Sequence, residues 1–283
     1  MNIVEFHDVS KQRKNFSIHK LNFSIPKGFI TGFIGPNGSG KTTTIQMMMD
    51  IFQLDEGDIF IFGTSHKKSQ LKQNIGFVYD DLYMYEEMTI KKMKSFIAPL
   101  YHNWNEKLFQ TYLEQFELPL KKKLKHFSKG MKMKCSLLFA LAHEPEFLVM
   151  DEPSAGLDPI FRRELLELLQ ELMIRENQTI FLSTHITTDL DRIADYIIFI
   201  NEGEIVFQKS MEELHEHFHI VKGKRELLDA DTRTIFTGIK ESEIGFTALF
   251  EGDPSLFSEF NEELVIEKAT LEDIMYFIVK RST

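Results

Sequence analysis

Cysteine is almost absent from this chain of 283 residues, where Cys135 stands alone. A single cysteine excludes an intrachain disulfide and is typical of a protein in a reducing compartment. Long apolar runs are missing too: residues 196–200 have the length of a strand, far below the ~20 residues of a membrane-spanning helix. Residues 1–5 show no basic and apolar regions of a secretory signal, so we expect none. If the protein works at a membrane, another molecule must hold it there.

Positive charge is also in short supply, because 33 lysines and arginines face 43 aspartates and glutamates. The formal net charge of -10 argues against a general nucleic-acid partner, since such proteins usually carry a basic field. It does not argue against ATP, whose charge is neutralised locally by a lysine, Mg²⁺ and backbone amides. We therefore expect no nucleic acid among the partners.

One phosphate-binding motif is complete. Residues 35–42, Gly-Pro-Asn-Gly-Ser-Gly-Lys-Thr, fit the template G-x-x-x-x-G-K-[ST]. Residues 29–34 predict a strand before this loop and residues 42–52 a helix after it. The free N–H groups and dipole of a helix start favour an anion, and glycines let the backbone close around it. A glycine turn with a surface lysine is the weaker alternative.

The predicted role of this loop is to hold a nucleotide. Lys41 would reach the β- and γ-phosphates, and the Thr42 hydroxyl would bind Mg²⁺. The candidate nucleotide contacts of the segment are Gly35, Asn37, Gly38, Ser39, Gly40, Lys41, Thr42 and Thr43.

Two later strands end in side chains that suit phosphate chemistry. An apolar strand over residues 147–151 ends in Asp151 and Glu152, and another over residues 179–185 ends in His185. Parallel strands deliver such residues to the edge of the sheet where ligands bind. We predict that Asp151 holds Mg²⁺ and that Glu152 orients or deprotonates the attacking water. Exposed loop acids and a structural histidine are the alternatives.

A further candidate is the helix start at Ser128, which precedes a helix predicted over residues 131–142. It is either a simple N-cap or a second phosphate-binding terminus presented to a nucleotide on another subunit. The surrounding lysines are by default a solvated face; contact with anionic lipid, or a local field for ATP at Lys129 only, are the alternatives. They are Lys121, Lys122, Lys123, Lys125, Lys129, Lys132 and Lys134.

The remaining pattern indicates an α/β protein. Two strand-like stretches before the loop predict a small antiparallel sheet beside the nucleotide site. Apolar residues at helical spacing over residues 89–117 predict a helical insertion. After Lys209 the core pattern stops, and residues 210–283 suggest an accessory subdomain with a final helix over residues 271–279. The histidines at 215, 217 and 219 could line one face of a strand around a metal, but a solvated helix or edge is favoured.

The motifs in this order resemble the nucleotide-binding subunit of an ABC transporter. The resemblance covers about residues 2–209. It implies a P-loop NTPase domain over residues 1–209, with an antiparallel β subdomain and a helical subdomain at about residues 82–143 that contacts transmembrane partners. Residues 210–283 would then be a small α+β C-terminal extension.

The same resemblance implies roles at the site. ATP with Mg²⁺ would lie between the loop of one subunit and Ser128 and Gly130 of a second ATPase subunit, which is a second copy or a different chain. Asp158, at the end of the turn after Glu152, would also contact the nucleotide, and His185 would sense the γ-phosphate. Glu152, His185 and Lys41 are thus the expected catalytic residues.

Three positions depart from the family pattern. The usual adenine-stacking aromatic falls near Arg13, whose guanidinium plane could stack instead. The usual glutamine that acts near the metal falls at Asp80, where a carboxylate could act on Mg²⁺ or water. Lys129 replaces a glycine of the signature motif.

In residues 23–28, the Ser-Lys-Gly-Met signature at residues 128–131 and the tail residues 220–224 and 271–275, the chain resembles ABC-2-type exporter ATPases of Gram-positive bacteria. Among them are those that export phenol-soluble modulins or confer resistance to antimicrobial peptides. This implies a peripheral ATPase at the cytoplasmic face of the cell membrane, bound to an integral-membrane permease. It would power export of amphipathic or antimicrobial peptides. The alternative is a soluble ABC ATPase in regulation, DNA repair or translation. The missing coiled coil, the single cassette and the acidic balance disfavour it.

Overall fold

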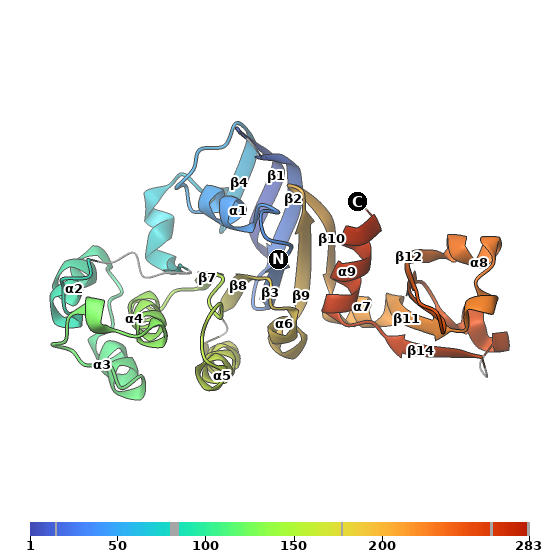
Figure 1. Ribbon diagram of the computed structural model, residues 1–283. Helices are drawn as coiled ribbons and strands as arrows, with labels where there is room; N and C mark the ends of the chain where they lie inside the picture. Colours follow the sequence, from blue (N-terminus) through green and yellow to red (C-terminus); the bar gives the residue numbers. More distant parts are fainter. Residues whose placement is uncertain (15, 80–84, 177, 261–262, 282–283) are drawn as a thin grey trace. The chain divides into compact units, whose positions relative to one another are not determined.

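The chain divides into two compact units. The computed structural model describes residues 1–14, 16–79, 85–176, 178–260 and 263–281 (Figure 1). The first unit is Met1–Ile186 with Ile198–Gln208, and the second is Thr187–Ile197 with Lys209–Thr283. The main division lies next to the boundary expected at residue 209. The sequence pattern had placed Thr187–Ile197 in the first domain, whereas the structure groups this stretch with the second unit.

A six-stranded sheet forms the centre of the first unit, in the order β10-β9-β3-β8-β7-β6. The strands are β3 (Ile30–Ile34), β6 (Ile75–Val78), β7 (Phe147–Asp151), β8 (Thr179–Thr184), β9 (Tyr196–Asn201) and β10 (Glu204–Ser210). β3, β8, β7 and β6 pair in parallel, and every residue of β3, β7 and β8 is buried. Burial on both faces explains their unbroken apolar runs. The carboxyl ends of β3, β8 and β7 therefore meet at one edge of the sheet.

An antiparallel sheet with the order β2-β1-β4-β5 completes the strands of this unit. Its members are β1 (Asn2–Arg13), β2 (Phe16–Pro26), β4 (Glu56–Ile61) and β5 (Thr64–Ser65). β1 and β2 pair as far as Arg13 and Phe16, with three register shifts along the hairpin. The ring of Phe23 stacks on Phe6 and on Phe33 of β3, with centroids 4.1 and 5.9 Å apart. The expected small sheet thus shares one core with the central sheet.

Five α-helices are described in the first unit, and three of them form the expected helical insertion. The helices are α1 (Lys41–Met48), α2 (Ile90–Ile97), α3 (Glu106–Gln115), α4 (Lys129–Leu141) and α5 (Pro159–Glu176), with 3₁₀ turns η1 (Ser69–Asn74), η2 (Ala98–Leu100) and η3 (Leu124–His126). Side chains of Thr89, Asn105 and Ser128 accept backbone N–H bonds at the starts of α2, α3 and α4. The prediction that Ser128 is an N-cap is confirmed.

A buried histidine ties the helical insertion to the sheet. Nε2 of His143, just beyond α4, lies 3.2 Å from the carbonyl oxygen of Ile75 in β6, and its ring stacks on Tyr101 at 3.9 Å. Burial lowers the pKa of His143, against the opposing effect of its backbone partners. The contact therefore holds the end of α4 on the central sheet.

Part of the lysine-rich stretch is neutralised by two glutamates. Glu87 accepts hydrogen bonds from Lys123 and Lys125 at 2.8 and 2.7 Å, and these bonds lower the pKa of its carboxyl group to about 2. Glu86 accepts one from Lys132 at 2.9 Å. The stretch is thus largely exposed to solvent, as expected by default, and three of its lysines pair with glutamates on that surface.

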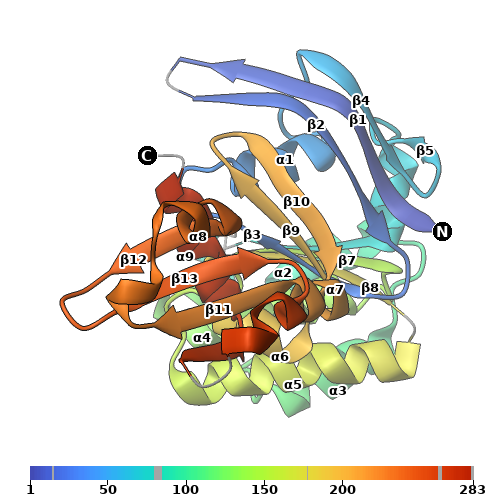
Figure 2. The ribbon, with the colours of Figure 1, turned by 90° about the vertical axis from the view of Figure 1, so that its right-hand side faces the viewer.

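The second unit is built on an antiparallel sheet with the order β12-β13-β11-β14 (Figure 2). It contains β11 (Phe218–Gly223), β12 (Phe236–Glu241), β13 (Phe246–Glu251), β14 (Leu264–Lys268), α6 (Thr187–Ile193), α7 (Met211–His217), α8 (Ala230–Ile235), α9 (Leu271–Arg281), η4 (Arg225–Leu227) and η5 (Pro254–Phe260). Val221, Ala248 and Phe250 belong to a small core of its own. It is an α+β unit, as expected for residues 210–283.

The histidines of this unit do not share a strand face. His215 and His217 lie on α7, whereas His219 lies on β11. In the described ranges, no group of three or more histidine, cysteine, aspartate or glutamate side chains is placed to hold a metal ion.

Candidate functional site

A cavity of about 720 Å³ lies over the glycine-rich loop between β3 and α1. Six of its lining residues belong to the loop and the first turn of α1, namely Asn37, Gly38, Gly40, Lys41, Thr42 and Thr43. All six were predicted to contact a nucleotide. This part of the lining is a helix start, whose free backbone N–H groups suit an anion together with the Lys41 ammonium.

Two glycines of the loop are required by its geometry. A Cβ atom on Gly35 would lie 2.2 Å from the backbone oxygen of Ile200 in β9, closer than any real contact. Gly40 has a φ of +113°, and its Cβ would lie 2.6 Å from Ile18. The loop packs between β9 and the β1–β2 hairpin too closely for side chains at these two positions.

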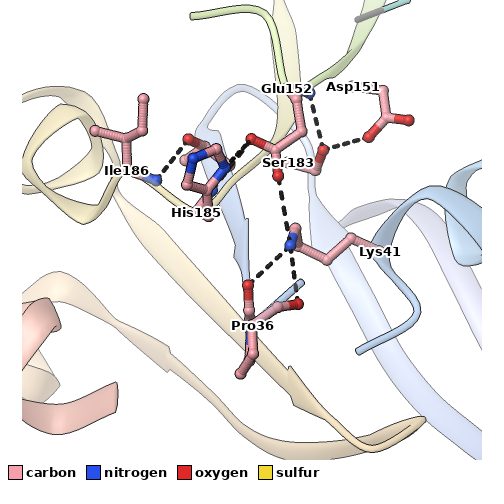
Figure 3. Close-up of polar contacts among 9 residues, drawn as sticks. Pro36, Lys41, Asp151, Glu152, Ser183, His185 and Ile186 are labelled. Carbon is pink, nitrogen blue, oxygen red and sulfur yellow. Dashed lines mark hydrogen bonds and ion pairs between the residues drawn. The ribbon is translucent and has the colours of Figure 1, made fainter. Parts of the chain in front are cut away.

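Lys41 joins the loop to the end of β7. Its Nζ donates to the carbonyl oxygens of Gly35 and Pro36 at 2.8 and 3.3 Å, and it lies 3.4 Å from Oε1 of Glu152 (Figure 3). The side chain is only 6% exposed. The ammonium is thus held at the floor of the cavity by two carbonyls and one carboxylate.

Glu152 and His185 also line the cavity and contact each other. Oε2 of Glu152 lies 2.7 Å from Nδ1 of His185 and accepts the backbone N–H of His185 at 3.2 Å. Glu152 has a φ of 48°, a left-handed conformation that is unfavourable for a residue with a Cβ. Such strain is found where the surrounding structure fixes a functional side chain. This backbone conformation could not be predicted from the residues around Glu152.

Ser183 connects the two acids at the end of β7. The backbone N–H of Glu152 donates to Oγ of Ser183 at 3.0 Å, and this hydroxyl donates to Oδ1 of the buried Asp151 at 2.5 Å. Ser183 lies opposite Asp151 in the β7–β8 register. Sequence reasoning missed Ser183. It could have been found from its position in the predicted strand, two residues before His185.

Arg13 does not line the cavity, in contrast to the sequence prediction. Its guanidinium carbon lies 4.2 Å from the ring centroid of Phe52. Phe16, its partner across the hairpin, lines the cavity instead and lies against Gly40. The register of β1 and β2 decides which residue reaches the loop. The prediction of Arg13 rested on sequence spacing from Gly28, which contains no information about this register.

The other residues expected at the nucleotide hold local structure. Ser128 caps α4, and Gly130 packs so closely against Phe161 that an added Cβ would lie 3.3 Å from its ring. Oδ1 of Asp158 accepts backbone N–H bonds from Ile160 and Phe161 at the start of α5. These three are absent from the cavity lining. Asp80, the remaining metal candidate, lies outside the described residues.

The signature segment still reaches the cavity through other residues. Phe127, Lys129 and Lys132 line it, as does Ala155 from the turn after Glu152. The sequence had singled out only Lys129 among the lysines as a source of a local field. The position of Lys132 in the cavity lining could not be predicted from the sequence, because it depends on how α4 is oriented relative to the loop.

One buried hydroxyl in the loop has no hydrogen-bond partner within the described part of the chain. Oγ of Ser39 is shielded from solvent, and it lies where a Cβ on Gly35 would approach it to 2.5 Å. A buried hydroxyl normally finds a partner, which an anion in the loop would supply. The loop therefore fits a phosphate group.

Comparison with known proteins gives consistent matches. A family model described as ABC transporter matches residues 18–155. The bacitracin transport ATP-binding protein BcrA of Enterococcus faecalis is 32% identical over 219 residues, 76% of this chain and 71% of that protein. The uncharacterized ABC transporter ATP-binding protein YcbN of Bacillus subtilis (strain 168) is 29% identical over 263 residues, 90% of this chain and 84% of that protein. A solved structure of the ATP-binding subunit of an ABC transporter has a TM-score of 0.68 and 27% identity, covering 75% of this chain and 92% of that chain.

Proposed function

The chain belongs to the family of ABC transporter ATP-binding proteins, which hydrolyse ATP, and from this premise we propose that it powers an ABC exporter of amphipathic or antimicrobial peptides. The observation that carries the proposal is the meeting of Lys41, Glu152 and His185 in one cavity at a phosphate-binding loop. Similarity to a protein named for bacitracin transport supports the cargo class.

In this proposal the loop of residues 35–42 holds the phosphates of ATP. Its N–H groups and the Lys41 ammonium would balance their charge, and the Ser39 hydroxyl would gain the partner that it lacks among the described residues. A bound phosphate would compete with Glu152 for the Lys41 ammonium. The Glu152 carboxylate could then bind a water molecule.

A magnesium ion fits the donors at this edge of the sheet. Thr42 offers a hydroxyl and Asp151 a carboxylate, and Mg²⁺ prefers a few protein oxygens completed by phosphate and water. The Ser183 hydroxyl orients one oxygen of Asp151. Asp80 stays a third candidate from the sequence. When bound, the ion would neutralise charge on the phosphates.

The chemical step falls to Glu152, which would orient or deprotonate the attacking water. His185 would hold the carboxylate in place and contact the terminal phosphate. The 2.7 Å bond between these two side chains supports this division of roles.

We infer that the working unit contains two ATPase subunits, as in the family. Ser128, Gly130 and Asp158 would then act at the nucleotide of the second subunit while keeping their local structural roles. A complete set of motifs in one chain makes a homodimer sufficient, and a pair of different ATPases uses the same chemistry.

The membrane partner would contact the helical insertion. Within the described ranges, none of the helices has both the length and the apolar character to span a bilayer. Phe96 and Leu100 are large apolar residues at the end of α2 and in η2, 57% and 66% exposed. They offer apolar contacts for a permease at the cytoplasmic face of the membrane, and Tyr85, which precedes α2, is a further large exposed residue.

This part of the proposal predicts a specific loss of partner binding. The chain purified in mild detergent from cells of its source is expected to carry a polytopic membrane protein, and Phe96→Ser is expected to release it. Ile174→Ser is the matched control, because Ile174 is also apolar and 85% exposed but lies on α5. Recovery of the wild-type chain without any membrane protein would instead support the soluble alternative.

Phe16 is expected to stack on the nucleobase. Phe16→Ala should weaken ATP binding roughly tenfold, in line with the energy of base–aromatic stacking. Arg13→Ala should change it less than about twofold, because the guanidinium lies over Phe52. Calorimetric titration with ATP measures both effects, and inorganic tripolyphosphate, which lacks a base, should bind both variants equally. A larger loss of ATP affinity in Arg13→Ala than in Phe16→Ala would instead show that Arg13 contacts the base.

A further inference from the structure

Ser183 is a buried serine beside the two acids at the end of β7 (Figure 3). It belongs to β8, where its neighbour across the sheet is Asp151. Asp151 is 2% exposed and Ser183 is fully shielded from solvent, and the serine is absent from the cavity lining. A residue in this position does not reach a bound nucleotide, so its effect on the reaction has to act through the two acids.

The direction of the hydrogen bonds at Ser183 is fixed by chemistry. The backbone N–H of Glu152 can only donate, so the serine oxygen, 3.0 Å away, is the acceptor. The single hydroxyl proton is then donated to Oδ1 of Asp151 at 2.5 Å, because an ionised carboxylate only accepts. A chain of two bonds therefore runs from the backbone of Glu152 through the hydroxyl to Asp151, and each bond polarises the other.

One end of this chain holds the candidate metal ligand. The bond from Ser183 to Oδ1 fixes the plane of the Asp151 carboxylate, which could otherwise rotate about its terminal bond. Groups that orient a metal-binding carboxylate in this way commonly change metal affinity or activity by about 10- to 100-fold when they are removed. The hydroxyl of Ser183 therefore has the position of an orienting partner for a metal ligand.

The other end of the chain holds the residue that is expected to act on water. The N–H of Glu152 also donates to the carbonyl oxygen of Ser183 at 3.1 Å, so one residue supplies both acceptors. These bonds offset the cost of the left-handed φ of 48° at Glu152. The Glu152 carboxylate contacts Lys41 and His185, and a change in its backbone direction would alter both contacts.

We propose that Ser183 is a positioning residue whose hydroxyl orients Asp151 toward Mg²⁺ and Glu152 toward the attacking water. The inference rests on the proposed function, from which it takes the roles of these two acids. It adds to them a residue of the neighbouring strand that touches neither substrate nor metal. The hydroxyl gives up no proton in the reaction, because its only task is to keep both acids in place.

Two sets of variants isolate the hydroxyl of Ser183. Ser183→Ala removes it, whereas Ser183→Thr and Ser183→Val have nearly the same shape as each other and differ in the hydroxyl. This second pair provides the test if the alanine variant fails to fold, because β-branched residues suit a buried strand. The matched control is Thr31→Val in β3 of the same sheet. Thr31 is buried, and its hydroxyl has no hydrogen-bond partner among the residues that the structure describes.

The first readout is metal binding without turnover. Calorimetry measures the Mg²⁺ concentration that half-saturates the chain at saturating ADP, and separately the dissociation constant of ADP in EDTA. Ser183→Ala and Ser183→Val should raise the Mg²⁺ concentration about tenfold and change the metal-free ADP constant less than about twofold. Ser183→Thr and Thr31→Val should stay within about threefold of the wild type in both quantities, since neither removes a hydroxyl that is bound to Asp151.

The second readout is the chemical step. With saturating Mg²⁺, Ser183→Ala and Ser183→Val should lower kcat about tenfold and change KM for ATP less than about threefold. In the Glu152→Gln background the same changes should lower the residual turnover less than about twofold, because the base that Ser183 orients is already gone.

Each readout can overturn the inference. It fails if ADP affinity in EDTA falls as much as Mg²⁺ affinity, if the valine variant equals the threonine variant, or if the tenfold loss of turnover persists in the Glu152→Gln background. A wild-type chain that bound no ADP, or whose complex with ADP did not take up Mg²⁺, would refute the proposed function instead.

Discussion

Glu152→Gln is expected to lower ATP turnover at least about 100-fold, the scale of losing a general base. The glutamine side chain has nearly the same size, and its oxygen can still accept a hydrogen bond from Lys41. It has no charge with which to orient or deprotonate water. Nucleotide affinity should hold or rise, because Lys41 would no longer share its charge with a carboxylate 3.4 Å away.

A suitable control lies close by in the sequence. Glu144 is exposed, has a φ of 53° and lies outside the cavity lining. Glu144→Gln therefore makes the same chemical change on the same kind of backbone. Steady-state phosphate release and ATP titration are measured for both variants and the wild type. Turnover of Glu152→Gln within about threefold of the wild type would remove Glu152 from the chemical step without affecting the family assignment.

The parts of the site that could be predicted depend on short stretches of sequence. The loop at residues 35–42 is specified by adjacent residues, and Asp151 and His185 follow apolar runs that had to be buried parallel strands. The carboxyl ends of parallel strands lie at the same edge of the sheet, regardless of the conformation of the loops between them. That is why these residues could be expected in one place before the fold was known.

What escaped prediction depends on contacts between distant segments. Phe16 and Arg13 are three residues apart, and register shifts along the β1–β2 hairpin decide which one lines the cavity. The pairing of Glu86 with Lys132 joins residues 46 positions apart, and only the packing of α4 against the segment before α2 creates it. Which side chains contact one another is decided by tertiary structure. Even a correct prediction of every strand and helix therefore does not identify these contacts.

The left-handed backbone at Glu152 belongs to the same class. No residue type in the stretch requires it, because glutamate rarely adopts a φ of 48°. It is fixed from outside by the two bonds of the Glu152 N–H to the carbonyl oxygen and hydroxyl of Ser183, at 3.1 and 3.0 Å. This backbone conformation orients the Glu152 carboxylate between Lys41 and His185.

Lys41→Met should reduce the affinity for ATP about 100-fold, because it removes a buried cation that would make charge-assisted bonds to two phosphates. Methionine has a similar length and fits the apolar part of the space. The same change leaves the Glu152 carboxylate, 15% exposed, without its cation. We therefore expect a second effect, a lower free energy of unfolding, because the mostly buried carboxylate would keep its contacts with His185 but lose its cation.

A double variant separates these two effects. In Lys41→Met with Glu152→Gln the unpaired charge is gone, so the free energy of unfolding in urea should recover while ATP affinity stays low. Lys27→Met is the control for loss of a lysine, because Lys27 pairs with Glu146 at 3.3 Å on the surface. It should alter neither quantity appreciably, as exposed ion pairs contribute little. If the double variant regained ATP affinity, the ammonium of Lys41 would serve only to neutralise Glu152, and the phosphates would be held by the loop amides alone.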